Sequence, residues 1–145
     1  MGESYLADVP GNHTHTAYLD PVLAGDATEE QVIFTAPFRA RIMAVSITAD
    51  AAVTGDATNR KNLNVINKGA AGAGSAEIGN LDLLAAENLV AADEKDFAGA
   101  TNGALTETEI LAGDVLALEI EQAGAGVAIP KSIVKVTYQA SGAGI

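Results

Sequence analysis

The chain has 145 residues, of which 48% are apolar, and its 19 acidic and 8 basic residues give a formal charge of −11. A single domain of this length buries about 68–70% of the surface of its extended chain. The negative charge argues against partners such as nucleic acid or an anionic membrane, which are bound through clustered Lys and Arg. The sequence has no cysteine, which excludes disulfides, thiolate catalysis and Cys-based zinc sites. No apolar run approaches the roughly 20 residues needed to span a bilayer.

Residues 1–28 differ from the rest of the chain. All six charged residues from Glu3 to Glu30 are acidic, and proline and glycine interrupt any periodic pattern. We therefore expect an extended N-terminal arm over residues 1–28 and a folded domain over residues 29–145. The arm could be a frayed terminus, but its apolar side chains favour a segment that orders on a neighbouring subunit. The predicted interface residues are Tyr5, Leu6, Val9, Tyr18 and Leu19.

The folded part contains short runs that alternate apolar and polar side chains, separated by turns of small residues. Alternation of this period is typical of half-buried β-strands. The patterns over 78–84 and 89–98 are weaker, and residues 78–84 could instead form a helical turn. About eight short strands predict an all-β fold, an antiparallel β-sandwich or jelly-roll-like domain. The expected strands cover residues 31–36, 38–49, 63–67, 78–84, 89–98, 106–111, 114–122 and 132–139.

In one of these strands, strict alternation would place charged and apolar side chains on the same face. Arg39 and Arg41 alternate in phase with Val45 and Ile47. A regular strand would therefore place two arginines and two aliphatic side chains on the same face. We expect a β-bulge near Ile42, because one extra residue exchanges the two faces of a strand.

Several turns carry a more specific signal. The stretch from Gln31 to Gly69 reads QVIFTAPFRARIMAVSITADAAVTGDATNRKNLNVINKG, and it is followed by GAAGAGSAEIGNL and later by AGDVLALEIEQAGAGVAIP. From Val32 to about Tyr138 the chain resembles the capsid decoration proteins of tailed bacteriophages. The resemblance consists of an Ala-Pro strand, a Thr-Gly-Asp-x-x-x-Arg loop, an Asn-Lys-Gly turn, a Gly-Asp-Val-Leu strand and a Gly-x-Gly-x-x-x-Pro turn.

The resemblance implies a structural virion protein that binds the outer surface of an assembled capsid and bridges its capsomers. It implies the major capsid protein as partner and oligomers at symmetric points of the shell. We expect a homo-trimer, because Gly-rich sheet edges are shielded in a symmetric oligomer. No secretory signal is visible, so we expect assembly in the host cytoplasm and a final location on the capsid exterior. The alternative is a β-sandwich binding module, for carbohydrate or for a receptor as in a head fibre.

Metal sites have little support in the sequence. His13 and His15 would project to the same side of a strand, as in cupin-type barrels, but such sites need a third histidine and the chain has two. Asp50, Asp56 and Asn59 could ligate calcium, but their spacing is irregular and such residues are also favoured in turns. We therefore expect no metal and no cofactor.

Paired carboxylates could serve as general acids and bases. In so acidic a chain, however, the same spacing arises on the polar faces of amphipathic strands. We expect no catalytic residue and no enzymatic activity. The pairs and clusters are Glu107 with Glu109, Glu119 with Glu121, and Asp93 with Glu94 and Asp96.

Overall fold

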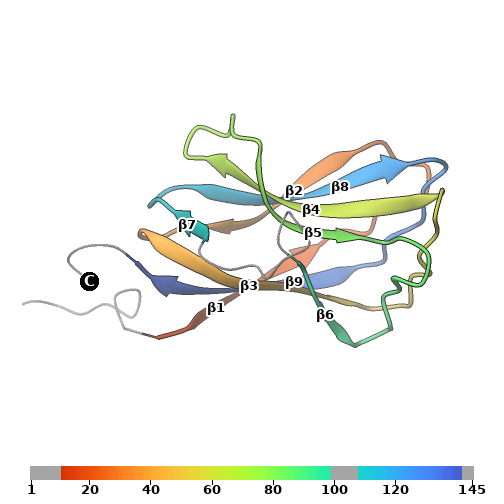
Figure 1. Cartoon of the computed structure of the whole chain (residues 1–145), viewed down its shortest axis with the longest axis horizontal. Coiled ribbons are helices and arrows are strands. Elements are labelled where there is room, and N and C mark those ends of the chain that lie inside the picture. The colour runs from red at the N-terminus through yellow and green to blue at the C-terminus, as the bar shows by residue number, and fades with distance from the viewer. Residues whose placement is uncertain (1–10, 99–107, 142–145) are drawn as a thin grey trace, which may run out of the picture.

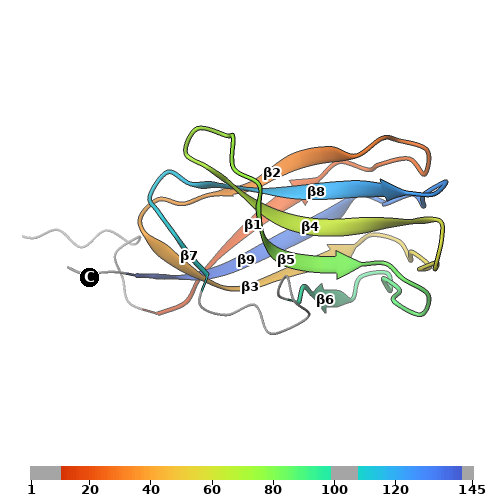
Figure 2. The same ribbon diagram turned by 45° about the horizontal axis from the view of Figure 1, so that its top comes forward.

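A computed structural model describes residues 11–98 and 108–141, and these form two antiparallel sheets packed face to face (Figure 1). Sheet I has the strand order β1-β9-β3-β6, and β7 also pairs with β3. Sheet II has the order β2-β8-β4-β5, which runs from top to bottom in Figure 2. The described residues contain no helix, so the predicted β-sandwich is confirmed, while the jelly-roll assignment stays a prediction. The strands are β1 (His13–Leu19), β2 (Glu29–Thr35), β3 (Ala40–Ala49), β4 (Arg60–Gly69), β5 (Ala76–Asp82), β6 (Glu94–Asp96), β7 (Thr108–Ile110), β8 (Val115–Ala123) and β9 (Ser132–Ala140).

The core lies between the sheets and is made of alternate side chains from the strands. Leu116, Leu118 and Ile120 of β8 are fully buried, and they face Val134 and Val136 of β9 across the interior. Each such side chain contributes about 1.5–3 kcal/mol by leaving water. The alternation predicted for residues 114–122 and 132–139 is confirmed.

The bulge predicted near Ile42 is also confirmed. The register between β3 and β9 shifts between Ile42 and Ala44. Ile42 is buried on one side of the shift and Val45 on the other, although their spacing in the sequence is odd. Arg41 is exposed, because the extra residue moves the arginines of this strand off the core face.

The two weaker predictions have different outcomes. The strand expected over residues 78–84 is confirmed as β5, with bounds 76–82 and β4 as its partner, and the alternative of a helical turn is wrong. Within residues 89–98 only β6 is a strand of three residues, and Leu89 before it forms an isolated bridge with Val53. This segment therefore crosses from sheet II to sheet I, to which it adds β6 as a short end strand.

The predicted arm over residues 1–28 is wrong for its second half. Residues 13–19 form β1, which pairs with β9 along its whole length. Val22 then bridges to Ile129, and both Leu19 and Val22 are buried in this chain's own core. These residues are therefore part of the sandwich, and the domain boundary does not lie at residue 28. Residues 1–10 are outside the described residues.

One end of the sandwich is tied together by a buried lysine. Lys61 of β4 is fully buried, and its Nζ donates to the backbone oxygen of Asp26 at 2.7 Å and to the side-chain oxygen of Gln122. The backbone amide of Gln122 donates to Thr28 Oγ1 at 3.0 Å. Burial lowers the pKa of Lys61, because the low-dielectric surroundings disfavour its charged form. The lysine thus links β4, β8 and the loop before β2.

The turn after β8 requires glycine at this same end. Gly126 has a φ of +72°, and a Cβ there would lie 2.1 Å from the backbone oxygen of Ala24. A side chain at this position would therefore push away the loop that Lys61 holds.

The placement of β1 can be tested with two adjacent substitutions. Leu19→Ala should lower the free energy of unfolding by about 2–5 kcal/mol, because it leaves a cavity in the core. Tyr18→Ala should change it by less than about 0.5 kcal/mol in dilute protein, because Tyr18 is exposed. Chemical denaturation measures both values. Equal, small effects would contradict the assignment of β1 to the sandwich.

Lys61 gives a second test. Lys61→Ala should cost about 2–5 kcal/mol, whereas Lys61→Met keeps the aliphatic stem and should cost less. Because the pKa is lowered in the folded state, the unfolded chain binds the proton more tightly. Stability of the natural chain should therefore rise with pH between the lowered pKa and the ordinary value of 10.5. Urea denaturation across this range should show no such rise for Lys61→Met, and a parallel rise in both proteins would contradict the assignment.

Candidate interaction surface

One side of the sandwich, formed by β1 and β2, is open. Each is an end strand of its sheet, and the two lie next to each other. Between them runs a hollow of about 290 Å³, which we name the edge groove. Phe34 and Ile33 form its floor, where they join the core. The edge groove is lined by His15, Ala17, Val32, Ile33, Phe34 and Thr35.

One side chain joins the two sheets beside this groove. Gln31 Oε1 of β2 accepts from the backbone amide of Asp20 at 2.9 Å, and Gln31 Nε2 donates to the backbone oxygen of Asp20 at 3.2 Å. The side-chain amide of Gln31 therefore makes the pair of hydrogen bonds that a residue of a neighbouring strand would make, and it connects sheet I to sheet II. It fixes the separation of the two edges, so the groove has a defined width.

Aromatic rings stiffen the same side of the sandwich. His13 stacks on Tyr138 with ring centroids 5.4 Å apart, and His15 lies 5.6 Å from Phe34. Phe34 and Tyr138 are themselves 4.8 Å apart. The two histidines project to one side of β1, as predicted, but they pack against rings of the interior.

A second hollow, of about 420 Å³, lies on the outer face of sheet II, and we name it the loop hollow. An ion pair of 3.0 Å between Lys68 and Glu30 lies among its lining residues. Val32 belongs to both hollows and is 67% exposed. The loop hollow is lined by Glu30, Val32, Lys68, Ala70, Ala71, Gly72, Val115 and Ala117.

The outer face of sheet I adds an apolar pair next to the open side. Tyr18 of β1 lies directly opposite Ile133 of β9, and they are 79% and 38% exposed. Of the predicted interface residues, Tyr18 is thus available to a partner. Leu19 is not, because it is 1% exposed inside its own core. Tyr5, Leu6 and Val9 lie outside the described residues, and their role stays a prediction.

The interface residues predicted from the sequence did not include Val32 and Ile133, which the structure exposes. A signal for Val32 was present, because three consecutive apolar residues, Val32, Ile33 and Phe34, cannot all point inward from a regular strand. The register between β2 and β8 shifts between Val32 and Phe34, so Ile33 and Phe34 are both buried and Val32 faces solvent.

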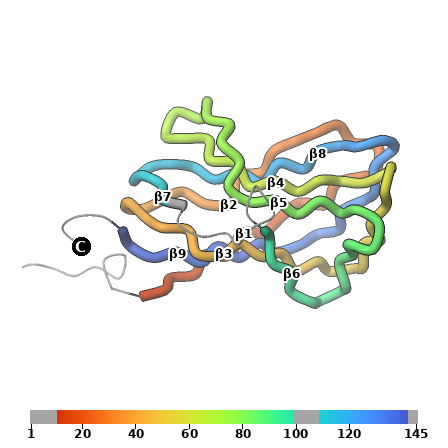
Figure 3. The backbone as a smooth tube through the Cα atoms, in the orientation of Figure 1, coloured from red at the N-terminus to blue at the C-terminus, as the bar shows by residue number. Residues whose placement is uncertain are grey.

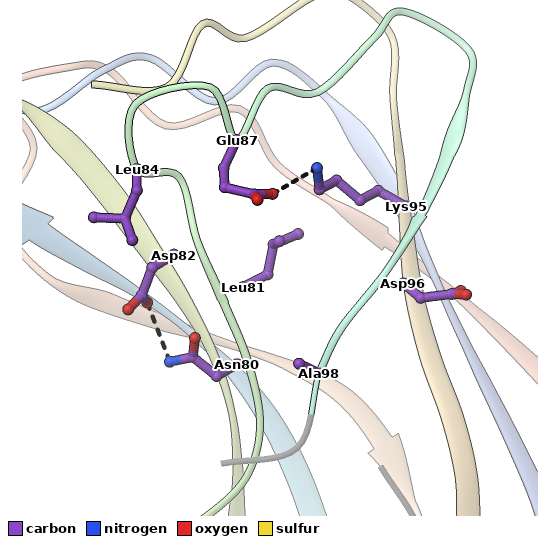
Figure 4. A pocket seen from close by; sticks show the side chains of 8 residues that line it. All are labelled: Asn80, Leu81, Asp82, Leu84, Glu87, Lys95, Asp96 and Ala98. Atoms are coloured by element: carbon purple, nitrogen blue, oxygen red, sulfur yellow. Dashed lines mark hydrogen bonds and ion pairs between the residues drawn. The ribbon is translucent and has the colours of Figure 1, made fainter. Parts of the chain in front are cut away.

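The opposite side of the sandwich is covered by the segment after β5. In Figure 3 this green segment descends from sheet II and loops into β6 of sheet I. Backbone hydrogen bonds of 2.9 and 3.0 Å between Asn80 and Ala98 close it against β5. The remaining groove, of about 310 Å³, has polar walls, with Lys95 paired to Glu87 at 2.9 Å and Asn80 bonded to Asp82 (Figure 4).

Two of the carboxylates that the sequence offered for catalysis, Glu94 and Glu109, are engaged in structural contacts. Glu94 accepts from Lys135 and Ser46, each at 2.7 Å, and these hydrogen bonds lower its pKa. Hydrogen bonds from Ser141 and Arg39 likewise lower the pKa of Glu109. Because their pKa values are lowered, the carboxyl groups of Glu94 and Glu109 are ionised at neutral pH and serve as ion-pair partners. Glu107 lies outside the described residues.

The remaining pair, Glu119 and Glu121, lies on the outer face of sheet II. Each accepts a hydrogen bond from an asparagine of β4, Glu119 from Asn64 at 2.9 Å and Glu121 from Asn62 at 2.8 Å. The two carboxylates therefore join neighbouring strands of the sheet.

The candidate calcium ligands do not converge. Asp50 lies 3.6 Å from Lys131, whereas Asp56 Oδ1 accepts from the backbone amides of Thr58 and Asn59 at 2.8 and 2.7 Å. The amide of Asn59 and then that of Thr58 lower the pKa of Asp56, so its carboxylate stabilises the turn. Over residues 11–98 and 108–141, no cluster of three or more His, Asp or Glu could hold a metal ion. Nor does this part of the chain contain a helix long and apolar enough to cross a membrane.

The stacking of His13 has a measurable consequence. His13→Ala should destabilise the domain by about 0.5–1.5 kcal/mol, the usual contribution of an aromatic pair beyond its buried area. His13→Phe is the matched control and should retain most of the stability, because it restores a flat ring against Tyr138. Thermal denaturation of the natural protein, His13→Ala and His13→Phe measures these differences in stability. A loss in His13→Phe as large as in His13→Ala would show that stacking is not what His13 contributes.

Comparison with known proteins adds no identification. A scan against protein-family models and a search of curated proteins found no match for this chain. The open side and the two hollows are therefore interpreted from their own geometry and chemistry.

Proposed function

We propose that this protein is a capsid decoration protein of a tailed bacteriophage, which binds the outside of the assembled shell and bridges its capsomers. The observation that carries the proposal is the distribution of exposed apolar side chains. Tyr18 and Val32, two of the most exposed large apolar residues, lie on the two strands of the open side of an otherwise acidic sandwich. Such a surface suits contact with another protein, because exposed apolar patches mark interaction sites.

The turns that resemble the decoration family have structural roles in this chain, which is compatible with a shared fold. In the Thr-Gly-Asp-x-x-x-Arg loop, Asp56 binds two backbone amides and Arg60 Nη1 donates to the backbone oxygen of Ala57 at 2.6 Å. In the Asn-Lys-Gly turn, Asn67 Oδ1 accepts from the amide of Gly69 at 2.9 Å. Asp114 before β8 accepts from the amide of Leu111 at 3.0 Å. These residues fix turns, and none of them needs a ligand.

The jelly-roll form of the sandwich belongs to the same proposal. Strand β4 joins β5 within sheet II, whereas β1, β2, β3, β5 and β8 are each followed by a strand of the opposite sheet. A path that alternates in this way between two layers is what two nested Greek keys produce.

The mechanism requires no active site. A protein that binds the assembled lattice and not its free subunits stabilises the lattice by about 2.7 kcal/mol per site at a hundred times its dissociation constant. Several contacts from one oligomer, a trimer in our proposal, would add avidity. The charge of −11 suits a position on the exterior, away from the packaged nucleic acid.

The alternative, a carbohydrate- or receptor-binding module, would need exposed aromatic rings for stacking. Of the tyrosines in the described residues, Tyr18 is free on the surface, whereas Tyr138 packs against Phe34 and His13. One isolated ring is a weak platform for a sugar, so capsid binding remains the better proposal.

Capsid binding can be tested by co-sedimentation with capsids purified from the phage whose genome encodes the chain. The natural protein should bind saturably and raise the temperature at which the capsids disrupt. Val32, one of the two residues that carry the proposal, also lines the loop hollow, so Ala71→Glu in that hollow should weaken binding at least about tenfold, equivalent to about 1.4 kcal/mol. Ala51→Glu adds the same charge at an exposed position outside the loop hollow and should bind like the natural protein.

Two results would count against the proposal. Absence of saturable binding to the capsids would reject the function itself. Equal binding by Ala71→Glu and Ala51→Glu would reject the loop hollow as the contact surface. Saturable binding to a glycan array that depends on Tyr18 would favour the alternative module.

A further inference from the structure

The end strands of the two sheets differ in charge. Natural proteins protect such strands with charged residues or proline, which hinder pairing with another chain. Strand β1, with the sequence HTHTAYL, has no Asp, Glu, Lys, Arg, Pro or Gly. Every other strand at the end of a sheet carries at least one charged residue: Glu29 and Glu30 in β2, Glu77 and Asp82 in β5, Glu94, Lys95 and Asp96 in β6, and Glu109 in β7.

One edge of strand β1 also lacks a partner strand within residues 11–98 and 108–141. The strand pairs with β9 on one side, and no other strand of the described residues pairs with it on the other. Its opposite flank is the edge groove, whose lining contains no charged side chain. In a chain with a charge of −11, this is the side on which a second copy would meet the least repulsion.

The sequence of β1 is complementary to itself in the antiparallel direction. Pairing about Thr16 sets Thr14 opposite Tyr18, and all three of these side chains are exposed on the outer face. Aromatic side chains opposite β-branched residues, and threonines opposite each other, are favourable cross-strand pairs. On the inner face the same register sets His15 opposite Ala17. Outward side chains therefore lie opposite outward side chains, and inward ones opposite inward ones.

We propose that β1 is the edge through which two copies of this chain associate, by antiparallel pairing about a twofold axis at Thr16. The pairing joins the two copies of sheet I into one continuous sheet. Because β2 lies beside β1, the same axis brings the two edge grooves toward each other. Tyr18 of each copy then lies near Thr14 of the other.

This inference goes beyond the proposed function and does not depend on it. A twofold contact joins two copies and cannot by itself build a trimer. On a decorated shell, it would connect copies that belong to neighbouring oligomers. The free protein should associate weakly, because the contact is narrow and the rest of both copies is acidic.

Crosslinking tests the contact directly, because the natural chain has no cysteine. Directly opposite residues of antiparallel strands have Cα atoms about 4.5–5.5 Å apart, which a disulfide can span. Under mild oxidation, full-length Thr16→Cys should give a disulfide-linked dimer at least about tenfold faster than Thr54→Cys, an exposed control on a loop. Equal rates for the two variants would overturn the proposal.

Sedimentation of the full chain provides the second measurement. Association of the natural protein and of Thr54→Lys should strengthen from low to 0.5 M salt, because salt screens the repulsion between acidic copies. Thr16→Lys places two like charges opposite each other and should weaken the association at least about tenfold. If Thr16→Lys associates as strongly as Thr54→Lys, β1 is not the contact. Neither experiment uses capsids, so its failure leaves the proposed function unaffected, and failure of capsid binding leaves this inference unaffected.

Discussion

Each sheet of the sandwich has two inner strands that pair on both sides, and one of the two in each sheet, β8 or β9, joins strands from the first half of the chain. In sheet II, β8 lies between β2 and β4, and in sheet I, β9 lies between β1 and β3. The inward side chains of both strands meet at the centre of the core, so a shift of one residue in either would turn apolar groups outward. The bulges in β2 and β3 keep the inward side chains of these strands aligned with those of their partners β8 and β9. The positions of the edge groove and of the exposed Val32 follow from that adjustment.

The outer face of sheet II shows how an acidic chain keeps its carboxylates close together. Asn62 and Asn64 lie on this outer face, yet they are only 8% and 6% exposed. Each lies opposite a glutamate of β8 and donates a hydrogen bond to it, and Asn80 of β5 extends the row by donating to Asn64 at 2.9 Å. The amides separate the negative charges across three strands. These polar groups therefore stabilise the sheet.

Alternation in the sequence was sufficient to predict the central strands and the bulge of β3, because each depends on a local conflict between apolar and charged positions. Strand β1 could not be recognised in this way. Its inward residues include His13 and His15, which do not count as apolar, and they belong to the core side only because Phe34 and Tyr138 provide rings to pack against. The edge groove depends on which strands end each sheet, and that information lies in pairings between distant segments. The hydrogen bonds of Gln31 with Asp20 likewise appear only once the two sheets are stacked.

The central positions of β8 and β9 also affect how the protein is made. On the ribosome, β1, β2, β3 and β4 emerge long before the strands that lie between them. His13 pairs with Tyr138, near the other end of the described chain, so β1 has no partner until residues 132–140 have been synthesised. Neither sheet can close on a nascent chain, and the apolar faces of four strands stay exposed to solvent or to chaperones during translation. Folding of the two sheets then begins after residues 132–140 have been synthesised and has to form contacts of high sequence separation, which makes it slow.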